Sequence, residues 1–235
     1  MNSSRGAVTA VFLDAGGVFN LPAPAEAARF LAAHGADGTL EAITRCHYHG
    51  MLAYDDAAES DDAGSSAYLT GFLAAAGLPA SLGGAFVDAI REPGWQPAIR
   101  SSLDVLPELS RRARLAVVSN SDGTVERRLA AAGVLQVGDG PGVRVLAVID
   151  SGAVGVAKPD PRIFDFALAA CGVGPEAAVH VGDSRRADVE GALAAGIRPL
   201  HLDPYGLCPD RSHEHLRTLG EVLEMLDEPA GQTPS

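Results

Sequence analysis

The feature that most constrains the fold is a short apolar run, residues 8–13, that ends on the carboxylate of Asp14 and is followed closely by two glycines. A continuous apolar run bounded by glycines is typical of a parallel strand that is buried on both faces. In open α/β sheets, ligands bind beyond the carboxyl ends of the strands. The run therefore predicts a buried strand that delivers Asp14 to the edge of an active site.

Strands and helices alternate in the second half of the chain. Four further apolar runs are predicted to be strands: 115–119, 145–149, 177–182 and 197–202. Segments with helical periodicity separate them, and such alternation predicts a doubly wound α/β fold with a parallel sheet and right-handed crossovers. A last helix is expected at 214–226.

The segment between the first strand and residue 96 has almost no strand character. Four helical patterns are predicted there: 24–34, 38–54, 65–76 and 80–91. An acidic stretch, 55–62, is expected to be a solvated loop. We therefore predict an α/β core made of residues 1–19 and 96–235, with an inserted α-helical cap domain at residues 20–95.

Charge and cysteine content restrict the partners and the compartment. A net charge of −12 argues against nucleic acid or an anionic membrane, because both require a basic face. The three cysteines form no close pair, so neither a disulfide framework nor a zinc cluster is expected. With no signal-peptide pattern, we expect a cytoplasmic monomer or homodimer that acts on a small molecule.

Polar residues stand at or just after the predicted strand ends. They are Asp14, Ser119 and Asn120, Lys158, and the pair Asp183 and Asp188. Lys158 is the single lysine among 18 lysine and arginine residues. In a parallel sheet these groups converge at one edge.

Their chemistry fits phosphoryl transfer. Three carboxylates form a hard oxygen site suited to Mg²⁺, and a carboxylate can attack phosphorus to give an aspartyl-phosphate. A serine hydroxyl, an amide and a lysine ammonium can bind phosphoryl oxygens. Gly16 and Gly17 would let the backbone approach the phosphoryl group closely.

Four ordered motifs resemble those of the haloacid dehalogenase superfamily. They are D-A-G-G-V, L-A-V-V-S-N, G-V-A-K-P-D-P-R-I-F and V-G-D-S-R-R-A-D-V-E-G-A-L-A-A-G. The resemblance covers about residues 8–205, and the helical insertion resembles the C1 cap of that family. It implies a Rossmann-like core and a magnesium-dependent hydrolase, most simply a phosphatase of a small phosphorylated metabolite.

The resemblance also implies residue roles. Asp14 matches the nucleophile, Ser119 the phosphate-binding hydroxyl, and Lys158 the lysine that neutralises the nucleophile and the phosphate. The implied metal ligands are Asp14, the carbonyl of Gly16, Asp183 and, in support, Asp188. Apart from the resemblance, the residues themselves suggest Gly17, Asn120, and Arg45 and His47 of the cap as the expected substrate contacts.

Gly16 departs from the family pattern, which usually has a second Asp there as general acid and base. Such help is worth ~10²–10⁴-fold. The leaving group could be acidic enough to depart unprotonated, or the cap could supply the acid. His47 and His49 are the candidates, and because they are two residues apart on a helix at most one should face the cleft. For both, a solvated helix face is the alternative.

Two other functions stay open. A 2-haloacid-dehalogenase-like hydrolase would need no acid, but the resemblance implies that such members are metal-free and lack acids matching Asp183 and Asp188. A catalytically impaired protein that binds a phosphometabolite would explain Gly16. If the chain is a phosphatase, Gly16 predicts slower turnover of alkyl phosphates than of esters with acidic leaving groups.

Overall fold

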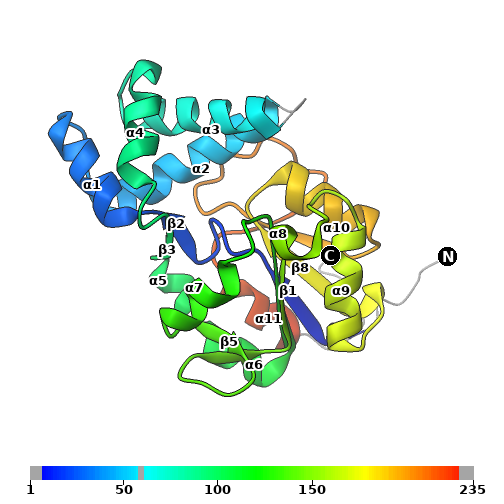
Figure 1. Ribbon diagram of the computed structural model, residues 1–235. Helices are drawn as coiled ribbons and strands as arrows, with labels where there is room; N and C mark the ends of the chain where they lie inside the picture. The colour runs from blue at the N-terminus through cyan, green and yellow to red at the C-terminus, as the bar shows by residue number, and fades with distance from the viewer. Residues whose placement is uncertain (1–6, 58–60, 228–235) are drawn as a thin grey trace.

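The structure, a computed structural model, describes residues 7–57 and 61–227. Its main sheet contains β1 (Ala10–Leu13), β4 (Arg114–Ser119), β7 (Ala147–Asp150), β8 (Ala178–Gly182), β9 (Arg198–Leu202) and β10 (Glu214–Leu216). The six strands are parallel, in the order β10-β9-β8-β1-β4-β7, so β1 lies inside the sheet (Figure 1). The strand order reverses at β1, which confirms the doubly wound α/β fold and puts Asp14 at the switch point where such sheets bind ligands.

Both faces of β1 are buried, which explains its continuous apolar sequence. Val11 and Leu13 pack on one face in a cluster with residues of α6 (Leu106–Arg112), α7 (Val125–Ala131) and α11 (Glu221–Asp227). Ala10 and Phe12 pack on the other face with residues of α9 (Arg162–Cys171) and α10 (Gly191–Ala194). Because β1 is buried on both faces, its end is held rigidly, and Asp14 projects from a fixed position.

The helical insertion has a hydrophobic cluster of its own, separate from the two that cover the faces of the sheet. It consists of α1 (Pro24–Ala33), α2 (Leu40–Asp56), α3 (Asp61–Ala75), the 3₁₀ turn η1 (Ala80–Leu82) and α4 (Gly83–Ile90). These elements lie together at one end of the molecule, drawn from blue to green (Figure 1). The chain enters through β2 (Asn20–Pro22) and returns through β3 (Trp95–Pro97), which pair antiparallel. The division of the chain at residues 20–95 stays a prediction.

The last helix, predicted at 214–226, begins later than predicted. Residues Glu214–Leu216 form β10, which pairs with β9, and α11 begins only at Glu221. The Glu221 carboxylate accepts hydrogen bonds from the backbone N–H groups of Arg217 and Thr218, each 2.9 Å long. These bonds cap the helix after the strand has ended.

Shorter elements fill the connections. They are α5 (Arg100–Leu103), β5 (Leu135–Val137), β6 (Val143–Val145), α8 (Ser151–Val154), the 3₁₀ turn η2 (Pro175–Ala177) and the π-helical turn η3 (Arg185–Glu190). β5 and β6 form a small parallel pair. Within the described residues, no single helix is long and apolar enough to cross a membrane. The segments Gly64–Ala75 and Ala80–Ile90 would meet the length and composition criteria only if taken together, and the chain bends by 119° between them.

Candidate active site

Asp14 projects from the end of β1 beside the single lysine of the chain. Its Oδ1 atom accepts the N–H of Ala15 at 2.7 Å and lies 3.0 Å from Lys158 Nζ. Burial raises the pKa of Asp14, and the ammonium of Lys158 partly offsets that rise. The carboxylate is therefore held in place at one oxygen, while 13% of its side chain stays exposed to the cleft.

Lys158 is fully enclosed by acceptors. Its Nζ donates to the carbonyl of Val118 at 2.8 Å and to Asp188 Oδ1 at 2.6 Å, in addition to its contact with Asp14. Burial opposes the charge on Lys158, but the two carboxylates outweigh burial and raise its pKa. The lysine is therefore a fixed positive charge next to the oxygen of Asp14.

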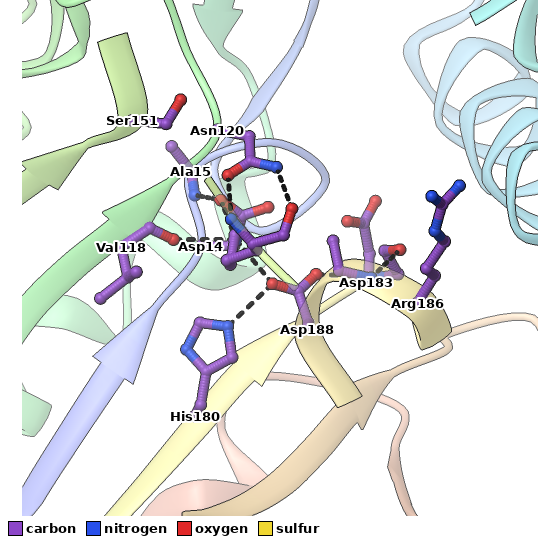
Figure 2. A network of polar contacts seen from close by, with 12 residues as sticks. Asp14, Ala15, Val118, Asn120, Ser151, His180, Asp183, Arg186 and Asp188 are labelled. Atoms are coloured by element: carbon purple, nitrogen blue, oxygen red, sulfur yellow. Dashed lines mark hydrogen bonds and ion pairs between the residues drawn. The ribbon is translucent and has the colours of Figure 1, made fainter. Parts of the chain in front are cut away.

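Asn120 holds Lys158 through the main chain. Its Nδ2 donates to the Lys158 carbonyl at 2.9 Å, and its Oδ1 accepts the Lys158 N–H at 2.8 Å (Figure 2). Asn120 lines the cleft, as expected of a substrate contact. Both polar atoms of its side-chain amide are bonded to the main chain of Lys158, however, so its structural role is to position the lysine.

Asp188, on η3, is the most heavily bonded acid of the site. Besides Lys158, its oxygens accept from His180 Nε2 at 2.8 Å and from the N–H of Ser184 at 3.0 Å (Figure 2). Although burial favours the neutral acid, Lys158 and His180 hold the pKa of Asp188 well below its usual range. His180 is not among the predicted site residues; its position as the single polar residue of β8 is the sequence signal that marks it.

His47 reaches the site from α2. Its Nε2 lies 2.7 Å from Asp183 Oδ2 and its Nδ1 lies 2.9 Å from the Tyr68 hydroxyl. Burial raises the pKa of Asp183 to about 6, an effect that the bond from His47 reduces. The alternative that His47 lies on a solvated helix face is wrong, because His47 is fully buried. His49 is half-buried and is not among the residues that line the cleft.

Gly17 makes room for that contact. Its φ is +61°, and a Cβ atom at this position would lie 1.8 Å from Asp183 Oδ2. Its N–H donates to the Asn20 carbonyl at 3.0 Å, and its carbonyl accepts the Tyr48 hydroxyl at 2.8 Å. Both backbone groups of Gly17 are thus bonded within the protein, and its positive φ gives it a conformational role; the expected substrate contact at Gly17 stays a prediction.

Gly16 leaves open space where the family usually places an acid. The atoms nearest to a Cβ there would be Trp95 Cζ3 at 3.7 Å and Asp14 Oδ2 at 3.8 Å. The Gly16 carbonyl, an expected metal ligand, accepts the N–H of Val18 at 2.6 Å. A side chain therefore fits at position 16. The Gly16 carbonyl keeps a second lone pair, which could still bind a metal ion.

These groups line one cleft of about 360 Å³. Besides Asn120, the predicted residues on its walls are Asp14, Gly16, His47, Ser119, Lys158, Asp183 and Asp188. Arg45 is not among the residues that line this cleft; it is exposed, pairs with Glu41 at 3.1 Å and lies over the ring of Tyr205, and its role as a substrate contact stays a prediction. Arg128 lines the cleft, with 38% of its side chain exposed and its guanidinium 3.3 Å from Asp122 Oδ2.

Asp55 connects the helical insertion to η3. Its carboxylate accepts from Ser184 Oγ at 2.7 Å and from the N–H groups of Arg185 at 2.6 Å and Arg186 at 3.1 Å. The prediction that residues 55–62 form a solvated loop is therefore wrong for Asp55, which is buried near the end of α2. Glu59, in the same stretch, lies outside the described residues. Asp55 caps the turn that carries Asp188.

The donor set fits a hard divalent cation. Asp14, Asp183 and Asp188 each bring a carboxylate oxygen to within 4.8 Å of the others. Mg²⁺ prefers oxygen ligands and is usually held by one or two carboxylates together with water and phosphate. Asp183 and Asp14 are the better placed to hold it, since both oxygens of Asp188 are bonded within the protein.

The family model of the haloacid dehalogenase-like hydrolases matches residues 52–196, which is more than half of the chain and includes three of the four motifs. The chain belongs to this family. Human haloacid dehalogenase-like hydrolase domain-containing protein 3 is 35% identical over 147 residues, which are 60% of this chain and 55% of that protein. The phosphoserine phosphatase of Thermus thermophilus is 49% identical over 74 residues, or 32% of this chain and 29% of that enzyme. The matched residues thus span about half or less of the length of these two relatives.

Solved structures of haloacid dehalogenase-like proteins share the fold. A putative hydrolase of the family from Bacillus subtilis, bound to magnesium, superposes with a TM-score of 0.62 and 20% identity over 95% of this chain and 100% of that one. A phosphatase of the family from Thermococcus onnurineus gives a TM-score of 0.58 and 20% identity over the same shares. At this identity the likeness concerns the fold alone.

Proposed function

We propose that this protein is a magnesium-dependent phosphatase that acts on a small phosphorylated metabolite through a phosphorylated Asp14. The observation that carries the proposal is the carboxylate of Asp14, 3.0 Å from a buried ammonium group and open to a cleft that Ser119 also lines. The name of one similar protein, the phosphoserine phosphatase of Thermus thermophilus, points the same way.

In the proposed reaction, an oxygen of Asp14 attacks phosphorus, and the bond from phosphorus to the leaving oxygen breaks. Water then attacks the acyl phosphate, which releases inorganic phosphate and restores the carboxylate. Lys158 and Ser119 would stabilise the charge on the phosphoryl oxygens. Bound Mg²⁺, held by Asp14 and Asp183, would supply further neutralisation of that charge.

The leaving group is proposed to be acidic, because position 16 carries no acid. His47 is the one cap imidazole on the cleft wall, but its Nε2 is bonded to Asp183 at 2.7 Å, so it acts as a positioning residue. In a series of aryl phosphates, we expect the rate to rise as the leaving-group pKa falls. A rate that is independent of leaving-group pKa would contradict this part of the proposal.

The helical insertion is proposed to act as the cap that closes the site. Met51 and Tyr54 on α2 and Trp95 on β3 line the same cleft as the carboxylates. Closing such a site excludes water and selects the substrate. The substrate would thus be a metabolite small enough for a 360 Å³ cleft.

The decisive experiment measures phosphate release from a panel of phosphorylated metabolites, with Mg²⁺ and with EDTA. The proposal expects release that needs Mg²⁺ and that Asp14→Asn abolishes. Halide release from 2-haloacids without Mg²⁺ would instead establish the dehalogenase alternative. If neither product forms, Gly16→Asp separates the remaining cases: phosphatase activity gained by that variant would identify a protein that lacks only its acid.

A further inference from the structure

We propose that His201, Cys208, His213 and His215 form a binding site for Zn²⁺, separate from the carboxylate cluster of the cleft. Each of the four side chains offers one ligand atom, and these atoms all lie within 4.8 Å of one another. The proposed function assigns no role to these residues. The sequence alone predicted no zinc cluster, because only one cysteine is involved and no spacing motif marks it.

Two adjacent strands supply the first pair of ligands. His201 on β9 and His215 on β10 are direct partners in the parallel register, so both side chains point to the same face of the sheet. Their ring centroids lie 5.1 Å apart. The sheet therefore sets this pair in place before any ion binds.

The connection between the two strands supplies the other pair. Cys208 Sγ lies 4.0 Å from His213 Nε2, and the same nitrogen lies 2.9 Å from His201 Nδ1. Cys208 and His201 are 4% and 5% exposed, and the His213 side chain is 2% exposed. Three imidazoles and a thiol are thus gathered in one largely buried place with nitrogen and sulfur atoms facing one another.

The donor set selects the ion. Imidazole and thiolate ligands in a four-membered set are those of structural Zn²⁺ sites, which are tetrahedral and closed. Mg²⁺ prefers oxygen and belongs with the three carboxylates. The two clusters therefore differ in chemistry as well as in position.

The outer contacts match those of metal-ligating histidines, whose second ring nitrogen typically bonds a carbonyl or a carboxylate. His201 Nε2 lies 3.2 Å from the main-chain carbonyl of Asp183. Both His215 ring nitrogens contact oxygen atoms, Nε2 the Asp210 carbonyl at 2.8 Å and Nδ1 the Asp203 Oδ2 atom at 3.3 Å. Binding of an ion would replace one of these two contacts and keep the other as the outer contact. A bound ion would thus fix the connection and, through His201, the main chain of Asp183.

The test measures metal in the full chain, purified without chelators and then loaded with Zn²⁺ or Co²⁺. We expect stoichiometric Zn²⁺ and, with Co²⁺, the near-ultraviolet charge-transfer band of a cobalt–thiolate bond. Cys208→Ser should abolish the band and weaken Zn²⁺ binding by at least about 100-fold, since even outer-shell changes cost 10–100-fold. Cys171→Ser is the matched control, because Cys171 is a buried free cysteine outside the cluster, and it should keep the band.

A second variant covers the case in which Cys208→Ser fails to fold. His215→Gln keeps the thiol and should lower Zn²⁺ affinity while leaving the circular dichroism spectrum unchanged. Absence of stoichiometric Zn²⁺ and of the cobalt–thiolate band in the unaltered protein would overturn the proposal, as would full Zn²⁺ affinity in both variants. None of these readouts depends on phosphatase activity, so the two proposals stand or fall separately.

Discussion

His47 Nε2 lies 2.7 Å from Asp183 Oδ2, and this contact joins α2 of the helical insertion to the carboxyl end of β8. An ionised carboxylate can only accept hydrogen bonds, so Nε2 carries the proton. Burial raises the pKa of Tyr68 well above its usual range, so its hydroxyl keeps its proton, and this hydroxyl lies 2.9 Å from His47 Nδ1. Tyr68 thereby orients His47, and His47 orients Asp183.

His47→Leu tests this chain of contacts. The variant removes the donor to Asp183, and outer-shell changes typically cost 10–100-fold in metal affinity. We expect the Mg²⁺ concentration for half-maximal phosphate release to rise by about 10–100-fold, with partial rescue in His47→Gln, which keeps an N–H donor. Unchanged Mg²⁺ dependence together with a loss of kcat confined to alkyl phosphates would identify His47 as the acid instead.

Lys158→Met tests the buried positive charge. The variant has a similar volume but leaves the carboxylates of Asp14 and Asp188 without their common partner. Removing one member of a buried ion pair costs about 3–5 kcal/mol. We expect a fall of that size in the free energy of unfolding, measured with urea, and loss of phosphate release. A variant as stable as the unaltered protein would show that the two acids are neutral in the folded state.

Gly17→Ala and Gly16→Ala form a matched pair of neighbouring substitutions. At position 17 the new Cβ would lie 1.8 Å from Asp183 Oδ2 and the backbone is left-handed, whereas at position 16 the nearest atoms are 3.7 Å away. We expect Gly17→Ala to lower the melting temperature and abolish phosphate release, and Gly16→Ala to preserve the melting temperature. Equal effects of the two substitutions would refute the packing argument.

The stability of the fold should depend on pH through His201. Burial and the neighbouring His213 lower the pKa of His201 from 6.5 to about 4 in the folded state. The unfolded chain therefore binds the extra proton between about pH 6.5 and pH 4, so the contribution of His201 is complete above that window and is lost as pH falls through it. With a chelator present, the free energy of unfolding should fall on the order of 3 kcal/mol further in the unaltered protein than in His201→Gln. Parallel pH profiles of the two proteins would contradict this assignment.

Much of the core was predictable from local pattern. The apolar run 8–13 and the four later runs predict the first five parallel strands of the sheet, whereas the sixth, β10, lies where the sequence pattern predicts the start of a helix. Because parallel strands bring their carboxyl ends to one edge, the positions of Asp14, Ser119 and Lys158 on one cleft followed from where each strand ends. Their spacing along the chain was sufficient for that inference.

By itself, the sequence determined the strand ends, the alternation of elements and the motifs of the family, since these are recorded in short-range periodicity and in residue order. The tertiary structure alone decided that His47 meets Asp183, 136 residues away, that Asp55 caps the turn of Asp188, and that His201, Cys208, His213 and His215 gather in one place. Such contacts depend on how separate helices, strands and loops pack against each other. Local periodicity reports which face of an element is buried, but it does not report which side chain of another element lies against that face.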